Sequence, residues 1–115
     1  MYNMTEQRPW GQYEILLDAE NTKVKRITVN PGGKLSYQYH NRRFEHWIII
    51  SGVAHITLED QLKLKTAGDS IYIPVLAKHR VENQQDYPLV FIEVQTGEYL
   101  GEDDIVRIED VYNRI

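Results

Sequence analysis

The sequence contains no cysteine among its 115 residues. A disulfide framework, a thiolate metal site and a cysteine nucleophile are therefore excluded. Long apolar runs are missing as well: Trp47–Ile50 has only four residues, whereas a membrane-spanning helix needs roughly 20. The first ten residues show no apolar signal-peptide region. These absences predict a cytoplasmic protein without a membrane partner.

Basic residues are fewer than acidic ones: the sequence has 13 Lys and Arg and 17 Asp and Glu, which gives a formal net charge of −4. A domain that binds nucleic acid usually needs a basic face, so this balance predicts no nucleic-acid partner. No repeat, low-complexity segment or Gly/Ser linker divides the chain. The length predicts one domain over residues 1–115, with residues 1–7 as a flexible N-terminal arm.

What the sequence does contain is a regular series of short β-rich runs between turn signals. The runs cover residues 24–29, 34–40, 46–50, 54–58, 63–65, 70–73, 79–82 and 89–95. Strands at this spacing predict an all-β sandwich or barrel. Only residues 102–112 have a helical pattern, which predicts a short helical or irregular C-terminal tail. The acidic residues at its start then form a charge cluster at the N-terminus of a helix.

A candidate metal site emerges from the alternation of side chains along a strand. Gln38 and His40 are two residues apart, so they leave the same face of their strand. Glu45 follows a short turn and can return on a neighbouring strand, and His79 arrives from a distant strand. Oxygen and nitrogen donors of these types predict a site for a divalent metal ion, formed by Gln38, His40, Glu45 and His79. Taken one by one, each could instead be a buried, hydrogen-bonded polar residue.

The same residues follow the two sequence motifs of the cupin superfamily. The first motif corresponds here to Gly32, Gln38-Tyr39-His40, Glu45 and Gly52, and the second to Gly68, Pro74, His79 and Asn83. Leu76 stands where the second motif carries a glycine after the proline. This resemblance implies an all-β fold with a single cupin barrel, also called a double-stranded β-helix or jelly roll.

A closer resemblance is to the C-terminal isomerase domain of type II phosphomannose isomerases, which usually follows a mannose-1-phosphate guanylyltransferase domain. It is carried by Arg8–Glu14, Gln38–Trp47, Tyr72–Asn83, Glu93–Gly97 and Tyr99–Arg107. The family's histidine-rich run after the first ligand histidine is replaced by Asn41 and Arg42. The glycine-rich nucleotidyltransferase motif is absent, which predicts a stand-alone isomerase-like domain. A separate guanylyltransferase of the same pathway, GDP-mannose biosynthesis, is then an expected partner.

This resemblance implies a metal-dependent aldose–ketose isomerase that interconverts mannose 6-phosphate and fructose 6-phosphate. It implies one divalent ion, which could be Zn, Mn, Co, Ni or Fe(II), and a phosphosugar substrate. The general base is open between Lys25, Lys78 and a carboxylate. Arg43 is a candidate for catalysis and for binding phosphate, because guanidinium groups suit phosphate oxygens. Arg26 and Arg80 are further candidates for binding substrate.

Two other functions fit the same residues. His40, His79 and Glu45 form the two-histidine, one-carboxylate set of non-haem iron oxygenases. A metal-containing sugar-binding cupin without turnover is the other alternative. For assembly, the outward-facing Tyr37 and Tyr39, with Ile48 and Ile50 on the next strand, would expose an apolar face, which predicts a homodimer. The candidate site residues are thus Gln38, His40, Glu45 and His79 for metal, Arg43, Lys25 and Lys78 for catalysis, and Arg43, Arg26 and Arg80 for substrate.

Overall fold

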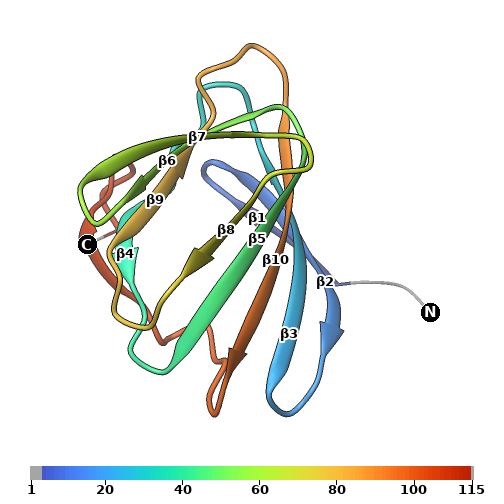
Figure 1. Cartoon of the computed structure of the whole chain (residues 1–115), viewed down its shortest axis with the longest axis vertical. Helices are drawn as coiled ribbons and strands as arrows, with labels where there is room; N and C mark the ends of the chain where they lie inside the picture. The colour runs from blue at the N-terminus through green and yellow to red at the C-terminus, as the bar shows by residue number, and fades with distance from the viewer. Residues whose placement is uncertain (1–3, 115) are drawn as a thin grey trace.

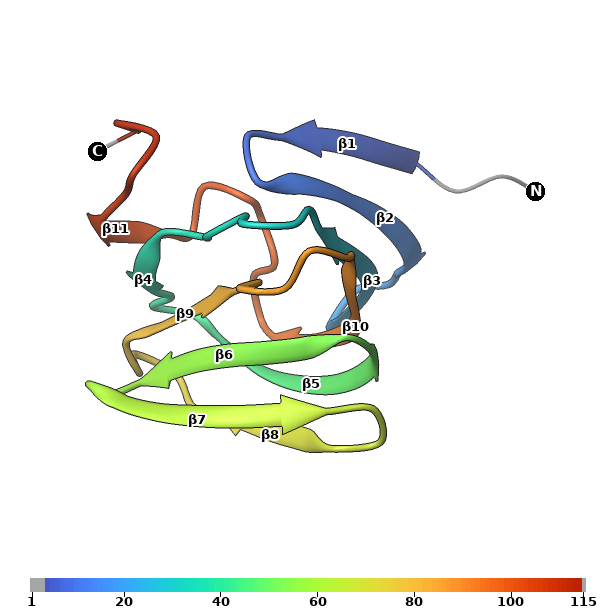
Figure 2. The ribbon, with the colours of Figure 1, turned by 90° about the horizontal axis from the view of Figure 1, so that it is seen from above.

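The chain forms two antiparallel β-sheets that face each other and enclose a barrel (Figures 1 and 2). The computed structural model describes residues 4–114. The six-stranded sheet has the order β1 (Met4–Arg8), β2 (Gly11–Asp18), β3 (Thr22–Val29), β10 (Leu89–Gly97), β5 (Arg43–Ser51) and β8 (Ser70–Ile73). The five-stranded sheet has the order β11 (Val106–Glu109), β4 (Tyr37–Tyr39), β9 (His79–Glu82), β6 (Val53–Leu58) and β7 (Gln61–Thr66). The all-β prediction is confirmed.

Alternation along the strands builds the core between the sheets. On β5, Trp47 and Ile49 point inward and are buried, whereas Ile48 and Ile50 point outward. The Trp47 ring packs against Phe91 of β10, with ring centroids 4.9 Å apart. Burying one such side chain contributes on the order of 2 kcal/mol, so the core of fifteen buried apolar residues is the main support of the barrel.

The two ends of the chain differ from the sequence-based expectation. Residues 1–3 of the expected N-terminal arm lie outside the described residues, and Met4–Arg8 form β1, which pairs with β2. Of the two alternatives for the tail over residues 102–112, helical or irregular, the helical one is wrong, because Val106–Glu109 form β11 along the edge of β4. Within residues 4–114 no helix is long and apolar enough to cross a membrane.

The strands β4 and β5 are not neighbours in one sheet, although the sequence predicted neighbouring strands before and after the short turn. They belong to different sheets: β4 pairs with β9 and β11, and β5 pairs with β10 and β8. The turn after His40 therefore crosses from one sheet to the other. Tyr37 and Tyr39 do not share a face with Ile48 and Ile50, so the apolar outer surface consists instead of Ile48, Ile50 and the neighbouring Tyr72.

Candidate functional site

Three potential metal ligands meet inside the barrel. His40 follows β4, Glu45 lies on β5 and His79 begins β9, so the two sheets contribute to one cluster. One ligand atom from each residue lies within 4.8 Å of the others. All three side chains are at most 4% exposed. The crossing turn between β4 and β5 brings His40 and Glu45 together from opposite sheets.

Backbone carbonyls fix the orientation of both imidazoles. The Nδ1 of His40 lies 2.7 Å from the carbonyl oxygen of Asp104, and the Nδ1 of His79 lies 2.9 Å from that of Ala77. A carbonyl oxygen can only accept a hydrogen bond, so each Nδ1 carries the proton and each Nε2 presents a lone pair to the cluster. The Nε2 of His79 is buried without a hydrogen-bond partner in the described structure. An orphaned imidazole nitrogen beside a carboxylate suits a metal ligand.

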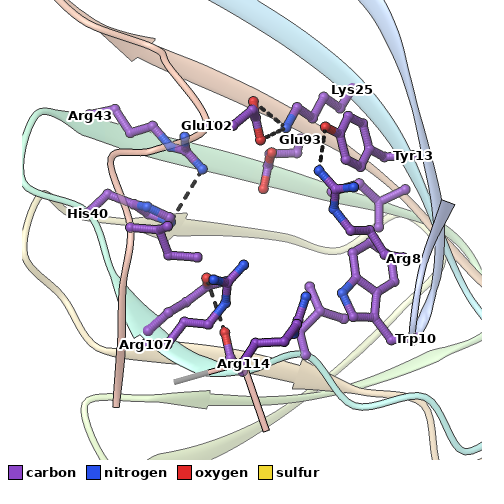
Figure 3. Close-up of a pocket in the computed structure, with 15 residues that line it drawn as sticks. Arg8, Trp10, Tyr13, Lys25, His40, Arg43, Glu93, Glu102, Arg107 and Arg114 are labelled. Atoms are coloured by element: carbon purple, nitrogen blue, oxygen red, sulfur yellow. Dashed lines mark hydrogen bonds and ion pairs between the residues drawn. The ribbon is translucent and has the colours of Figure 1, made fainter. Parts of the chain in front are cut away.

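Arg43, the first residue of β5, already contacts this cluster (Figure 3). Its Nε and Nη2 donate to Oε2 of Glu45 at 2.9 and 2.8 Å, and its Nη2 lies 3.3 Å from Nε2 of His40. The indole Nε1 of Trp47 donates to the other oxygen, Oε1, of Glu45 at 2.8 Å. A metal ion bound to Nε2 of His40 would take the place of the hydrogen bond from Arg43.

The protonation states in the cluster are those that metal ligands need. Burial alone would raise the pKa of the Glu45 carboxyl, but the charge of Arg43 and the nearby histidines hold that pKa well below its usual range. Burial lowers the pKa of His40 to about 4. Near neutral pH, Glu45 is therefore ionised and His40 is neutral, which fits a divalent ion held by imidazole nitrogen and carboxylate oxygen.

Gln38 lies next to the cluster on β4, opposite His79 in the β4–β9 pairing. Its side chain lines the pocket beside the cluster. The amide oxygen of Gln38 accepts a hydrogen bond from Oγ of Ser36 at 3.3 Å. The predicted alternation, with Ser36, Gln38 and His40 on one face, thus brings all three to the same pocket.

The pocket also holds two carboxyl groups in different environments. Glu102 accepts hydrogen bonds from Nζ of Lys25 at 2.8 Å through both oxygens, and that Nζ lies 4.0 Å from the centre of the Tyr13 ring. Glu93 accepts a hydrogen bond from Nε2 of Gln95 at 2.7 Å. Burial, and then repulsion from Glu45, raises the pKa of Glu93 to about 8. One pocket therefore contains a cation–carboxylate pair and a carboxyl that holds its proton at neutral pH.

Three of the predicted catalytic or substrate-binding residues do not line this pocket. Lys78 is exposed before β9. Arg26 points to the outer face of β3 and pairs with Glu14 at 2.9 Å. Arg80 is buried, but its guanidinium bonds Glu109 at 2.8 Å and the Leu35 carbonyl at 3.0 Å. Of the residues predicted for these roles, Lys25 and Arg43 line the pocket.

Several pocket residues had no role in the sequence-based prediction: Arg8, Arg107, Arg114, Glu93 and Glu102. Four of them lie inside the segments that carry the family resemblance, which was the available signal. Asp104, in the last of those segments, was also missed. Its carboxylate accepts hydrogen bonds from the backbone N–H groups of Asn41 and Arg42, both at 2.9 Å. Glu102 and Asp104 thus make contacts around the pocket rather than begin a helix.

The chain matches a family model described as "Mannose-6-phosphate isomerase C-terminal" over residues 2–110. It is 52% identical over 107 residues to the xanthan biosynthesis protein XanB of Xanthomonas campestris, covering 93% of this chain and 23% of that protein. It is 49% identical over 108 residues to the mannose-1-phosphate guanylyltransferase ManC of Salmonella typhimurium, covering 94% and 22%. The chain thus spans less than a quarter of the length of these relatives.

Among solved structures, an RmlC-like cupin from Shewanella frigidimarina superposes with a TM-score of 0.75 at 20% identity. The superposition covers 88% of this chain and 87% of that one. At this level of identity the likeness shows a shared fold, which confirms the predicted cupin barrel. Because the family model covers nearly the whole chain, this chain belongs to the mannose-6-phosphate isomerase C-terminal family of cupins.

Proposed function

We propose that this domain is a metal-dependent aldose–ketose isomerase that interconverts mannose 6-phosphate and fructose 6-phosphate. One observation carries the proposal: a single pocket joins a His/Glu/His cluster that could hold a metal ion to the acid–base groups Glu93 and Glu102. Membership of the family supports the substrate class. The identity of the divalent ion is part of the proposal, with Zn, Mn, Co, Ni and Fe(II) as the candidates.

The reaction moves a proton between two adjacent carbons of the open-chain sugar through an enediol. When bound by His40, Glu45 and His79, with Gln38 beside them, a divalent ion would polarise the sugar's carbonyl and hydroxyl oxygens. Burial alone would raise the pKa of Glu102, but Lys25 holds it below its usual value, so Glu102 is ionised and can accept the carbon-bound proton. Glu93, which keeps its own proton near neutral pH, can donate to a sugar oxygen.

Lys25 has a positioning role in this scheme. Its ammonium group contacts both oxygens of Glu102 and lies over the Tyr13 ring, so it holds the carboxylate in the pocket. The same ion pair disfavours protonation of Glu102 in the resting state. This contact favours the carboxylate as the base, one of the alternatives that the sequence left open.

The two positions where the family's histidines are replaced lie away from the proposed metal ligands and acid–base groups, and this supports the proposal. Asn41 and Arg42 are exposed and do not line the pocket. The guanidinium of Arg42 lies 4.5 Å from the centre of the Tyr99 ring and pairs with Glu98 at 3.5 Å, at the surface. A departure from the family pattern at these two positions therefore leaves the metal ligands and the acid–base groups in place.

A coupled isomerase assay on metal-stripped protein tests the proposal, with each of the five candidate ions returned in turn. We expect one or more ions to restore turnover of mannose 6-phosphate. His79→Ala should lose both metal and activity, because each imidazole contributes strongly to a site with so few ligands. His46→Ala is the matched control, since His46 neighbours Glu45 but is exposed on the outer face. No turnover with any ion would refute the isomerase assignment.

The same cluster also fits a non-haem iron oxygenase. Oxygen consumption by the Fe(II)-loaded protein in the presence of a candidate sugar separates the two enzymes. The neighbouring Lys25–Glu102 pair favours the isomerase, because oxygen activation at iron has no need of it. A sugar-binding protein without turnover would bind mannose 6-phosphate and leave it unchanged in the coupled assay.

A further inference from the structure

Three arginines from distant parts of the chain meet in the wall of the pocket. Arg8 is the last residue of β1, Arg107 lies on β11, and Arg114 lies in the segment after β11. In Figure 3, Arg107 and Arg114 lie on the side opposite Lys25 and Glu102, and Arg8 lies across from His40. The cationic side of the pocket is thus formed by the first strand and the last segment of the described chain.

Two of these guanidinium groups already have a carboxylate partner. Arg8 pairs with Glu6 at 2.8 Å and donates to the Tyr13 hydroxyl at 3.2 Å. Arg114 pairs with the buried carboxylate of Asp110 at 2.7 Å. These contacts hold both side chains in place at the pocket. Arg8 with Glu6, and Arg114 with Asp110, therefore each form an ion pair with no net charge.

Arg107 differs from its neighbours. Within residues 4–114 it has no ion pair, and its Nε is buried without a hydrogen-bond partner. Burial and repulsion from Arg114 lower the pKa of its guanidinium. A buried donor without a partner is costly, and that cost is removed when an acceptor arrives. The three arginines and two carboxylates leave one positive charge, centred on Arg107, inside a pocket that can admit a ligand.

We infer that Arg107, flanked by Arg114 and Arg8, is the binding subsite for a phosphate monoester. A guanidinium offers several N–H donors in one plane and grips a phosphate through two oxygens. The other candidates are less suited: Arg43 is committed to Glu45, and Arg26 lies outside the pocket. For the sugar part of the ligand, the inference rests on the proposed function. The phosphate would then lie away from the cluster of His40, Glu45 and His79, where the proposed chemistry takes place.

Calorimetric titration of the purified, metal-containing protein with mannose 6-phosphate, inorganic phosphate and mannose tests this subsite. Arg107→Ala should weaken binding of the two phosphate-bearing probes by about 10- to 100-fold, the range for loss of a charge-assisted bond. Binding of mannose should stay unchanged. Arg107→Lys should recover part of the affinity, because an ammonium keeps the charge and loses the planar fork.

Arg26→Ala is the matched control, because it removes the same charge from the outer face of β3 and should change affinity by less than about twofold. If Arg107→Ala binds phosphate like the wild type, or if Arg26→Ala loses as much, the subsite is refuted. Nitrogen-15 NMR of the wild type needs no variant: inorganic phosphate should shift the Nε–H signal of Arg107, and an unmoved signal also refutes the subsite.

The two proposals fail in different ways. Phosphate binding that depends on Arg107, without turnover by any metal-loaded form, supports the subsite and refutes the isomerase. Turnover of mannose 6-phosphate with an unchanged KM in Arg107→Ala supports the isomerase and refutes the subsite.

Discussion

Replacing Asp104 by alanine should weaken both the fold and the metal site. The Asp104 carboxylate accepts two backbone hydrogen bonds, from Asn41 and Arg42, in a residue only 7% exposed. A hydrogen bond to a charged group contributes about 1.5–3 kcal/mol, and because two bonds that share one carboxylate are less than additive, their joint loss should cost about 2–4 kcal/mol. For a chain of this length that loss corresponds to roughly 8–16 °C in Tm. The magnitude is large because the turn between β4 and β5 has this carboxylate as its anchor.

The effect on metal follows from the main chain of the same residue. The Asp104 carbonyl accepts the Nδ1–H of His40, so loosening the segment frees the imidazole to rotate. Loss of such an outer contact typically reduces metal affinity by about 10- to 100-fold. Differential scanning calorimetry and zinc titration measure the two effects. Asp103→Ala is the control, because Asp103 is the exposed neighbour. A Tm within about 2 °C of the wild type, or unchanged zinc affinity, would refute the reasoning.

Four further outcomes are expected. The metal-free protein should lose about 3 kcal/mol of its free energy of unfolding through His40 as the pH falls from 6.5 to about 4, because the imidazole of the unfolded chain takes up a proton first. Urea titrations in which the stability of His40→Gln falls with pH as steeply as that of the wild type would contradict this. Arg43→Ala should destabilise the metal-free protein by leaving Glu45 without its cation, and zinc should then raise the Tm more than in the wild type; equal rises would argue against it. Leu76→Gly should raise the Tm by a few degrees, because Leu76 has a φ of 69° and is exposed; a lower Tm would speak against relief of backbone strain. We expect a homodimer through the apolar surface of β5 and β8 that Ile48→Lys converts to a monomer by light scattering, and a wild-type monomer at high micromolar concentration would exclude it.

Spacing along the strands was enough to bring the candidate metal ligands together. Gln38 and His40 share strand parity, and the short turn before Glu45 limits how far it can move away. The same spacing could not decide between a hairpin and a crossing between sheets. That choice depends on the hydrogen-bond partners β9 and β10, which come from residues far along the chain. The closeness of the candidate ligands was therefore predictable, although the path of the chain that connects them was not.

Three strands, β1, β2 and β11, were missed by the sequence-based prediction, and β1 and β11 lack the usual pattern of a buried face. In β1 the sequence Met4–Arg8 is mostly polar and the strand lies at the sheet edge. In β11 the alternation is inverted: Val106 and Ile108 are exposed, while Arg107 lines the pocket. A rule that turns apolar residues inward places the wrong face of β11 toward the barrel. The cationic side of the pocket was hidden from the sequence for this reason.

Which basic residues enter the pocket depends on parity and register rather than on composition. Lys25 and Arg26 are neighbours on β3, yet Lys25 lines the pocket and Arg26 pairs with Glu14 outside. Arg80 follows the candidate ligand His79 directly and is tied to Glu109 of β11. The sequence shows a surplus of basic residues near the site, but the pairing of each strand is needed to sort them.

The split of the ligand cluster between the two sheets has a consequence for the motions of the barrel. His40 and His79 belong to the side of the five-stranded sheet, and Glu45 belongs to the six-stranded sheet. An ion held by all three would cross-link the sheets at one end, so any breathing motion that separates them would have to break a coordination bond. Amide hydrogen exchange in β4, β5 and β9 should therefore slow together on addition of metal. Exchange in the edge strand β7, which carries no ligand, should depend on local opening and stay unchanged.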